Sequence, residues 1–357
     1  MDLPLPLPLV PMLAKAVADV PDPAAVEGGL LFEPKWDGFR CLVLKDGDEV
    51  ELASRGKRPL TRYFPDVVEA ARTTLPRRCA LDGELVVRVG PSGAQRLSWE
   101  SISARIHPAA SRVERLARET PAEFVGFDLL ALGEVSLLDE PFAQRRAALE
   151  ELSAQWPADS RLHVTRVTRD RDEAMDWFER FEGAGLDGIV AKPLTAPYAP
   201  GKRSMLKVKH KRTAEAVVVG YRVHTSGTGV GSLLLGLYEE DGQLRNVGGI
   251  GAFTAAMRRE LIARLDPLVI RNEDGATAHA ETDRSRFSAS KDVGYVPLRP
   301  ELVVEVAFDQ LEGSRFRHAV TLLRWRPDRE PRSCTLEQIE RAPAYDLGAV
   351  LVSHVSG

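Results

Sequence analysis

The sequence contains little cysteine and no long apolar run. Only three cysteines, Cys41, Cys79 and Cys334, occur among 357 residues. They are too few for a disulfide framework or a four-cysteine zinc site, and they indicate a reducing, cytoplasmic environment. No apolar stretch reaches the roughly 20 residues that span a bilayer. The N-terminus, "MDLPLPLPLVPM", is broken by proline and lacks the basic start of a signal peptide, so we expect an extended arm there.

The sequence also lacks an excess of positive charge. The net charge is −4, which excludes a global positive field and leaves local clusters as the source of any affinity for nucleic acid. One such cluster, "GKRSMLKVKHKR", covers residues 201–212. Within it Lys207 and Lys209 alternate with Leu206 and Val208, which predicts a strand with both lysines on one face.

Lysine is scarce in this arginine-rich chain. Among 48 basic residues only ten are lysine, so arginine supplies most positions that need a positive charge alone. A lysine amine can lose its proton and act as a nucleophile, whereas a guanidinium stays charged. We therefore look for chemistry at the seven lysines that fall in or near motif-like segments: 35, 57, 192, 202, 207, 209 and 211.

The pattern of predicted elements divides the chain in two. Residues from about 28 to 210 alternate strand and helix signals, whereas the later residues form strands separated by glycine-rich turns around one helix, "TAAMRRELIARLDPL". Five strands and a helix favour a β-barrel of the OB type, a fold that often binds nucleic acid. The predicted class is α+β, with a first domain at 1–210, an OB-fold domain at 211–345 and a C-terminal tail at 346–357.

One short segment, "FEPKWDGFRC" at residues 32–41, places a lysine between two strand-like runs. Trp36, Asp37 and Gly38 form the predicted turn, in which Gly38 is free to take a positive φ. The simplest interpretation is a β-hairpin with a solvated Lys35 at the strand end.

The order of motifs along the chain supports a different interpretation, because it resembles that of the covalent nucleotidyltransferases and specifically the ATP-dependent DNA ligases. "EPKWDGFRC" is similar to the nucleophile motif E-x-K-x-D-G-x-R of that family. Six further motifs follow in the family's order: "SRGK" at 54–57, "DGEL" at 82–85, "FVGFD" at 124–128, "DGIVAK" at 187–192, "LKVK" at 206–209 and "RPDR" at 326–329. Only about thirty residues precede the first motif, so the chain resembles the small two-domain bacterial C-type (LigC-like) class.

The resemblance implies a nucleotidyltransferase (adenylation) domain of antiparallel sheets and helices, followed by the OB-fold domain. It implies a DNA ligase that seals nicks in duplex DNA through a Lys–AMP intermediate and a DNA-adenylate, in DNA repair. ATP is then the cosubstrate, with Mg²⁺ or Mn²⁺ as the metal. The implied partners are nicked double-stranded DNA and repair proteins, for a monomeric, nucleoid-associated protein.

The family's residue roles carry over as follows. Lys35 is the adenylated residue, and Lys207 and Lys209 neutralise the phosphate. Glu33 contacts the adenine amino group, Phe127 stacks on adenine, Arg40 and Arg55 hold ribose or phosphate, Glu84 binds ribose or metal, and Arg326 and Arg329 complete the nucleotide site. A lysine amine is mostly protonated at neutral pH, and neighbouring positive charge favours its neutral form.

Two positions depart from the family's motifs. The fourth motif usually begins with Glu, and the shorter Asp187 stands there, so its assignment as a metal ligand is an expectation that depends on reach. Met205 replaces the usual Trp of the fifth motif. Predicted DNA contacts are Arg55, Lys57, Arg203, Arg315 and Arg317.

Two alternatives stay open on the sequence alone. One is an RNA ligase or an mRNA capping-type guanylyltransferase from the same superfamily. The other belongs to a different class, a non-catalytic nucleic-acid-binding OB protein. The presence of Lys35, Glu84, Lys207 and Lys209 argues against the second.

Overall fold

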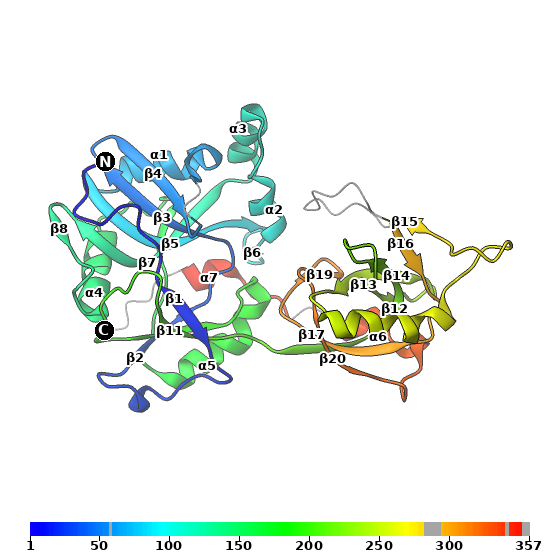
Figure 1. Cartoon of the computed structure of the whole chain (residues 1–357). Helices are drawn as coiled ribbons and strands as arrows, with labels where there is room; N and C mark the ends of the chain where they lie inside the picture. The colour runs from blue at the N-terminus through cyan, green and yellow to red at the C-terminus, as the bar shows by residue number, and fades with distance from the viewer. Residues whose placement is uncertain (57–58, 282–293, 340–342, 352–357) are drawn as a thin grey trace. The chain divides into compact units, whose positions relative to one another are not determined.

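The computed structural model describes residues 1–56, 59–281, 294–339 and 343–351, which separate into two compact units, each with its own hydrophobic core (Figure 1). Unit 1 contains Met1–Lys209 and the C-terminal residues 343–351, and unit 2 contains residues 210–339. The α+β class expected from the sequence is confirmed, because both units combine sheets with helices.

The larger sheet of unit 1 has seven strands in the order β4-β3-β5-β7-β8, with β6 beside β5 and β9 beside β7. Its pairs are antiparallel except β7–β9. The strands are β3 (Phe39–Asp46), β4 (Glu49–Ser54), β5 (Arg78–Val89), β6 (Arg96–Leu97), β7 (Ala122–Leu132), β8 (Val135–Ser136) and β9 (Leu162–Val164).

The smaller sheet of unit 1 has four strands in the order β1-β11-β10-β2. They are β1 (Leu13–Ala16), β2 (Leu30–Pro34), β10 (Ile189–Pro193) and β11 (Arg203–Val208). Apolar side chains from both sheets and from the N-terminal arm share one core, which includes Leu3, Met12, Leu42, Leu130 and Met205. The two sheets of unit 1 are therefore packed together, and the arm is part of the core.

One helix of unit 1 begins and ends at residues that favour helix boundaries. In α5 (Arg171–Arg180), the Asp170 side chain accepts hydrogen bonds from the main-chain N–H groups of residues 172 and 173, and the following turn closes on Gly185 at φ +88°. The other helical segments are η1 (Pro23–Ala25), η2 (Thr61–Tyr63), α1 (Pro65–Thr74), α2 (Trp99–Ala104), α3 (Ala110–Glu119), α4 (Phe142–Ser153) and η3 (Phe181–Ala184).

The segment "FEPKWDGFRC" does not form a hairpin. β2 belongs to the smaller sheet and β3 to the larger one, so the chain crosses from one sheet to the other between residues 34 and 39. Gly38 is needed for close approach rather than for a positive φ, because a Cβ at this position would lie 1.9 Å from the carbonyl oxygen of Leu85. The predicted turn is thus a crossing between sheets.

The C-terminal residues 346–351, which were expected to form a tail, belong to unit 1. They include α7 (Leu347–Leu351), the red helix among the elements of unit 1 in Figure 1. Leu347 and Val350 are buried in a core with Trp177 and Phe181, and the Leu347 N–H donates to the carbonyl of Gln95 at 2.8 Å. Burial of two apolar side chains accounts for the ordered helix.

Unit 2 is a β-barrel of the OB type. β12 pairs with β13, β16 and β17, β13 pairs with β14, and β17 pairs with β20. A parallel bridge between Ile250 and Val320 links the β14 edge to the chain that enters β20. The elements are β12 (Arg212–Val223), β13 (Val230–Tyr238), β14 (Leu244–Ile250), α6 (Ala255–Leu265), η4 (Asp266–Leu268), β15 (Ala280–Glu281), β16 (Gly294–Pro297), β17 (Val303–Phe308), β18 (Leu311–Glu312), β19 (Arg315–Phe316), β20 (Thr321–Trp325), η5 (Pro331–Ser333) and η6 (Leu336–Ile339).

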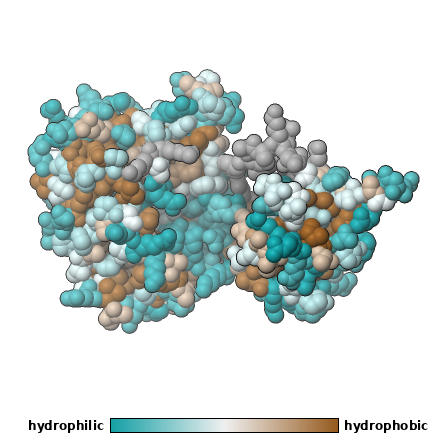
Figure 2. Space-filling view, in the orientation of Figure 1, coloured by the Kyte–Doolittle hydropathy of each residue, from teal (hydrophilic) through white to brown (hydrophobic). Residues whose placement is uncertain are grey.

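The visible face of each unit mixes hydrophilic residues with scattered hydrophobic ones (Figure 2). Over the described ranges, every helix is too short or too polar to cross a membrane. Cys41, Cys79 and Cys334 are free and buried, as expected from their scattered positions.

Candidate active site

Lys35 lies at the point where the chain leaves the smaller sheet. Its Nζ is 2.7 Å from Oδ2 of Asp187, and the same oxygen is 2.8 Å from Nζ of Lys209. The backbone fixes this arrangement, because the Lys35 N–H donates to the carbonyl of Gly188 and the Asp187 N–H donates to the carbonyl of Lys35. Three residues that are far apart in the sequence thus form one charged cluster.

The electrostatics of this cluster follow from its composition. Burial alone would raise the pKa of Asp187, but Lys35 and Lys209 outweigh burial and hold that pKa below its usual value. Desolvation, with Lys35 and Lys209 nearby, lowers the pKa of Lys207. β11 ends at Val208, so Lys207 lies on the predicted strand whereas Lys209 directly follows it. Lys207 is nevertheless near Lys35, and Lys209 shares the Asp187 oxygen with it.

Glu84 and Arg40 enter the site from the larger sheet. They are opposite each other on β5 and β3, and Oε1 of Glu84 accepts the N–H of Gly38 at 3.2 Å. Burial raises the pKa of Glu84 to about 7, although Arg40 and Lys35 oppose the rise; the charge of Asp37 adds to it. Asp37, which had no assigned role, is therefore a close neighbour of Glu84.

Phe127 occupies a bulge in β7. Asp82 of β5 pairs with Asp128, and the next residue, Gly83, pairs with Gly126, so Phe127 has no partner on β5. Bulges reorient side chains and are frequent beside active sites. The guanidinium of Arg40 lies 4.3 Å from the centre of the Phe127 ring, and Nζ of Lys192 lies 4.5 Å from it. In this structure cationic groups contact the ring that is predicted to stack on adenine.

Glu33 forms a buried ion pair that the sequence did not predict. Oε1 of Glu33 lies 2.9 Å from Nζ of Lys192, whose side chain is only 2% exposed. Burial raises the pKa of Glu33, and Lys192 opposes the rise. Oε2 of Glu33 is also buried and has no hydrogen-bond partner among the residues that the structure describes. The motif "DGIVAK" contained this lysine, but spacing alone does not show what it pairs with.

Asp82 and Tyr198 are a second pair that sequence reasoning missed. Asp82 accepts two hydrogen bonds from Arg40, both at 2.6 Å, and a third from the Tyr198 hydroxyl at 2.6 Å. Desolvation and the charge of Asp82 raise the pKa of Tyr198 well above its usual value. Asp82 belongs to the motif "DGEL", whereas nothing in the sequence points to Tyr198.

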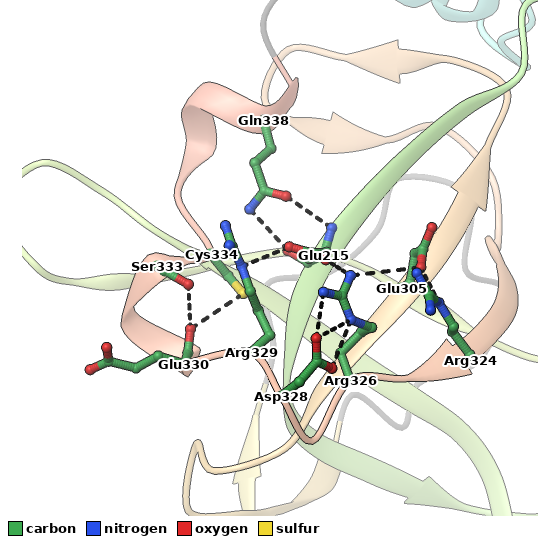
Figure 3. A network of polar contacts seen from close by, with 10 residues as sticks. All are labelled: Glu215, Glu305, Arg324, Arg326, Asp328, Arg329, Glu330, Ser333, Cys334 and Gln338. Carbon is green, nitrogen blue, oxygen red and sulfur yellow. Dashed lines mark hydrogen bonds and ion pairs between the residues drawn. The ribbon is translucent and has the colours of Figure 1, made fainter.

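The two arginines of "RPDR" lie in unit 2 in a network with carboxylates (Figure 3). Arg326 pairs with Glu215 and makes hydrogen bonds to Asp328 at 2.8 to 3.2 Å, and Nε of Arg329 lies 2.7 Å from Oε2 of Glu215. Glu305 is 3.8 Å from Arg326. The motif therefore forms one cluster, in which acidic side chains neutralise both arginines.

The residues predicted to contact DNA occupy both units. Arg55 follows β4 and is exposed, one residue beyond the Ser54–Cys41 pair, and Arg203 is exposed at the start of β11. In unit 2, Arg315 donates to Oδ1 of Asn246 at 3.3 Å and Arg317 pairs with Gln310. Lys57 lies outside the described residues.

A divalent cation would find two carboxylates near Lys35, those of Glu84 and Asp187. The described ranges contain no group of three or more His, Cys, Asp or Glu that could hold a metal by itself. Mg²⁺ commonly takes one or two carboxylates together with substrate phosphates and water. Burial raises the pKa of Glu84, and a cation bound at this carboxylate would favour its charged form. The donor set therefore fits a cation that is completed by the substrate.

Both units match family models along most of their length. Residues 11–209 match the ATP dependent DNA ligase domain, and residues 226–329 match the ATP dependent DNA ligase C terminal region. The chain is 53% identical to DNA ligase C1 of Mycolicibacterium smegmatis, covering 98% of this chain and 99% of that relative. It is 50% identical to DNA ligase C of Mycobacterium tuberculosis, again over 98% and 99% of the two chains.

A solved structure from a structure–function study of Lig E DNA ligases shares the fold. It has a TM-score of 0.54 and 19% identity, and the match covers 89% of this chain and 100% of that one. The family models and the relatives show that the chain is a nucleotidyltransferase and belongs to the ATP-dependent DNA ligases. It is thus a DNA ligase that uses ATP, as the resemblance implied.

Proposed function

We propose that this ligase seals nicks in duplex DNA through a covalent AMP adduct on Lys35. The observation that carries the proposal is the contact of the Lys35 amine with Asp187 and its proximity to Lys207 and Lys209. A lysine amine is a nucleophile once it has lost its proton, and the contact with Asp187 holds the Lys35 amine in a fixed position. The same cations stabilise negative charge on a phosphate that changes partners.

The proposed reaction then has three steps. Lys35 Nζ forms a P–N bond to the α-phosphate of ATP, loses its proton, and displaces pyrophosphate. The 5′-phosphate at the nick next attacks the adenylate, which breaks the P–N bond and forms a phosphate–phosphate linkage. Finally the 3′-hydroxyl loses its proton to solvent and attacks the activated 5′-phosphate, which forms the phosphodiester, breaks the phosphate–phosphate linkage and releases AMP.

The other predicted side chains hold the nucleotide. Arg40 and Arg55 bind ribose or phosphate, Phe127 stacks on adenine, and Glu33 accepts from its amino group. Arg326 and Arg329 orient the leaving pyrophosphate. To do so, they must release their carboxylate partners Asp328 and Glu215 and bind phosphate oxygens instead. Glu84 and Asp187 would hold Mg²⁺ or Mn²⁺, which supplies positive charge against the phosphates.

DNA repair is the proposed context, with the enzyme acting as a cytoplasmic, nucleoid-associated monomer that meets repair proteins at the nick. Arg55, Lys57, Arg203, Arg315 and Arg317 are its proposed DNA contacts. Phosphate contacts suit a nick because a nick occurs in any sequence.

Labelled ATP and a denaturing gel test the nucleophile. Wild-type protein should retain label, and Lys35→Arg should retain none, because a guanidinium keeps the contact with Asp187 but stays protonated. Lys202→Arg, which changes an exposed lysine in the basic segment, is the matched control and should label normally. Label on the Lys35→Arg protein would reject the assignment.

A further inference from the structure

One glutamate of unit 2 holds both arginines of the motif "RPDR". Nη1 of Arg326 pairs with Oε1 of Glu215, and Nε of Arg329 lies 2.7 Å from Oε2 of the same carboxylate (Figure 3). The side chain of Glu215 is only 16% exposed, so water weakens these contacts less than it would on an open surface. The two arginines that are proposed to bind the leaving pyrophosphate therefore already share a carboxylate partner.

The fold keeps Glu215 in this position. The residue lies on β12, where its N–H donates to Oε1 of Gln338 at 3.0 Å and its carbonyl accepts from Nε2 of Gln338 at 3.2 Å. Gln338 belongs to η6, so two segments that are far apart in the sequence fix the main chain of Glu215. We therefore expect Glu215 to stay in place when the arginines bind another anion.

A second glutamate makes the release of Arg326 unfavourable. Glu305 lies directly opposite Glu215 in the β12–β17 pair, and like charges at such positions repel each other. Arg326 lies near both carboxylates, because its Nη1 is also 3.8 Å from Oε2 of Glu305. Arg324 compensates Glu305 in part, with its Nε 2.6 Å from Oε2. When Arg326 binds another anion, the two glutamates face each other with less positive charge between them.

The third carboxylate of the network has less influence on the release. Asp328 accepts hydrogen bonds from Arg326 at 2.8 to 3.2 Å, but its side chain is 63% exposed. Water can replace a lost arginine partner at such a position, and exposed ion pairs contribute little. The main resistance to the release of Arg326 therefore comes from Glu215, together with its neighbour Glu305.

We propose that Glu215 is a positioning residue that competes with polyphosphate for Arg326 and Arg329. It thereby sets how tightly the enzyme binds the triphosphate of ATP and the leaving pyrophosphate. This inference rests on the proposed role of the two arginines and deepens it. An anion with several negative charges competes better with the single carboxylate than an anion with one charge does.

The competition has a thermodynamic consequence. The contacts of Glu215 are intact both in the free enzyme and in the adenylated enzyme, and they are broken when either ATP or pyrophosphate binds to the arginines. Glu215 therefore slows the formation of the adduct and its reversal by pyrophosphate by the same factor, and it leaves the equilibrium between them unchanged.

The test measures adduct formation from ATP and reversal of the adduct by pyrophosphate. Glu215→Gln keeps the size of the side chain and removes its charge. We expect kcat/KM for adduct formation to rise by about 3- to 10-fold, and reversal to accelerate by the same factor. Sealing of a pre-adenylated nick, from which no pyrophosphate leaves, should be unchanged. A merely structural role of Glu215 would instead lower the rates in both directions.

Glu301→Gln is the matched control. Glu301 also lies in unit 2 and pairs with an arginine, with Nε of Arg299 at 2.6 Å from its Oε1, but it lies outside the network. This variant should keep both rates. A Glu215→Gln protein that is folded by its thermal unfolding, yet has rates at or below the wild-type values, would overturn the proposal.

Titration with inorganic tripolyphosphate separates this proposal from the proposed function. Lys35→Arg protein, which should form no adduct, should bind tripolyphosphate about 3- to 10-fold more tightly when Glu215→Gln is added. Unchanged affinity would refute the role of Glu215 whether or not the adduct forms on Lys35. If the double variant Arg326→Ala, Arg329→Ala binds tripolyphosphate as well as wild type, the proposed role of the arginines is wrong, and that of Glu215 with it. Weaker binding by the double variant, with no gain from Glu215→Gln, would reject Glu215 alone.

Discussion

Replacing Tyr198 by phenylalanine removes one oxygen from a closed ring of hydrogen bonds. The hydroxyl donates to Oδ2 of Asp82 at 2.6 Å and accepts the N–H of Met12 at 3.0 Å. Asp82 also accepts from Arg40, and Nη2 of Arg40 donates to the Met12 carbonyl at 3.4 Å. The ring ties the N-terminal arm to two motifs of the active site, and its members are buried or half-buried.

The size of the effect follows from what each partner loses. A hydrogen bond to a buried carboxylate contributes about 1.5–3 kcal/mol, and a buried N–H left without an acceptor costs about 1 kcal/mol or more. Asp82 keeps both bonds from Arg40, so it is not orphaned. We expect Tyr198→Phe to lower the free energy of unfolding of unit 1 by about 2–4 kcal/mol.

Native-state hydrogen exchange measures this loss of stability at individual amides. A local measurement is needed because the two units need not unfold together. The Met12 amide should lose protection by an amount that matches the lost stability. Tyr221→Phe makes the same chemical change in unit 2 and should leave Met12 unaffected. A loss below about 0.5 kcal/mol with full protection of Met12 would refute the reasoning.

Three further perturbations give separate tests. Burial raises the pKa of Glu84 from 4.5 to about 7, so the folded chain binds more protons than the unfolded chain in that interval and stability falls as pH rises through it. The fall amounts to at most about 3 kcal/mol, and Glu84→Gln should remove it when denaturation is measured without nucleotide or metal. If the variant keeps the pH profile of the wild type, the raised pKa of Glu84 is contradicted. Gly188→Ala places a Cβ 2.0 Å from the Val208 carbonyl oxygen at φ +128°. In thermal unfolding it should lower the free energy of unfolding by about 3 kcal/mol or more. Gly201→Ala, at φ +71° in open space, should lower it by about 1 kcal/mol. Arg317→Ala should reduce the salt slope of binding to nicked duplex by about one, equally on two unrelated sequences, and a strong preference for one sequence would argue against phosphate contacts.

The parts of the site that could be predicted depend on local patterns. Alternation predicts the strand at residues 203–208 that carries Lys207, whereas Lys209, predicted on the same strand, lies just beyond its end. The helix of residues 171–180 has a capping aspartate and an acidic first turn, both legible in the sequence. Motif order then links these local elements to one chemistry.

The parts that could not be predicted depend on contacts between residues distant in the sequence. Tyr198 donates a hydrogen bond to Asp82, which lies 116 positions away in the sequence, and no pattern near either residue predicts this contact. The partner of Glu33 lies in a motif that was recognised, yet the pairing depends on how β2 and β10 align. The ordered α7 depends on an apolar surface supplied by α5 and η3.

The nucleophile segment shows how tertiary structure determines what a turn signal means. Asp37 and Gly38 favour a tight turn, which sequence rules read as a hairpin. In unit 1 the strands before and after it join different sheets. Lys35 directly follows β2 of the smaller sheet and Asp187 closely precedes β10 of that sheet, whereas Glu84 lies on β5 of the larger sheet. Any side chain at Gly38 would collide with the Leu85 carbonyl of β5 and keep the crossing segment from lying against the larger sheet. The short crossing brings the Gly38 N–H within 3.2 Å of Oε1 of Glu84, and this close approach is why glycine stands three residues after the lysine at the strand end.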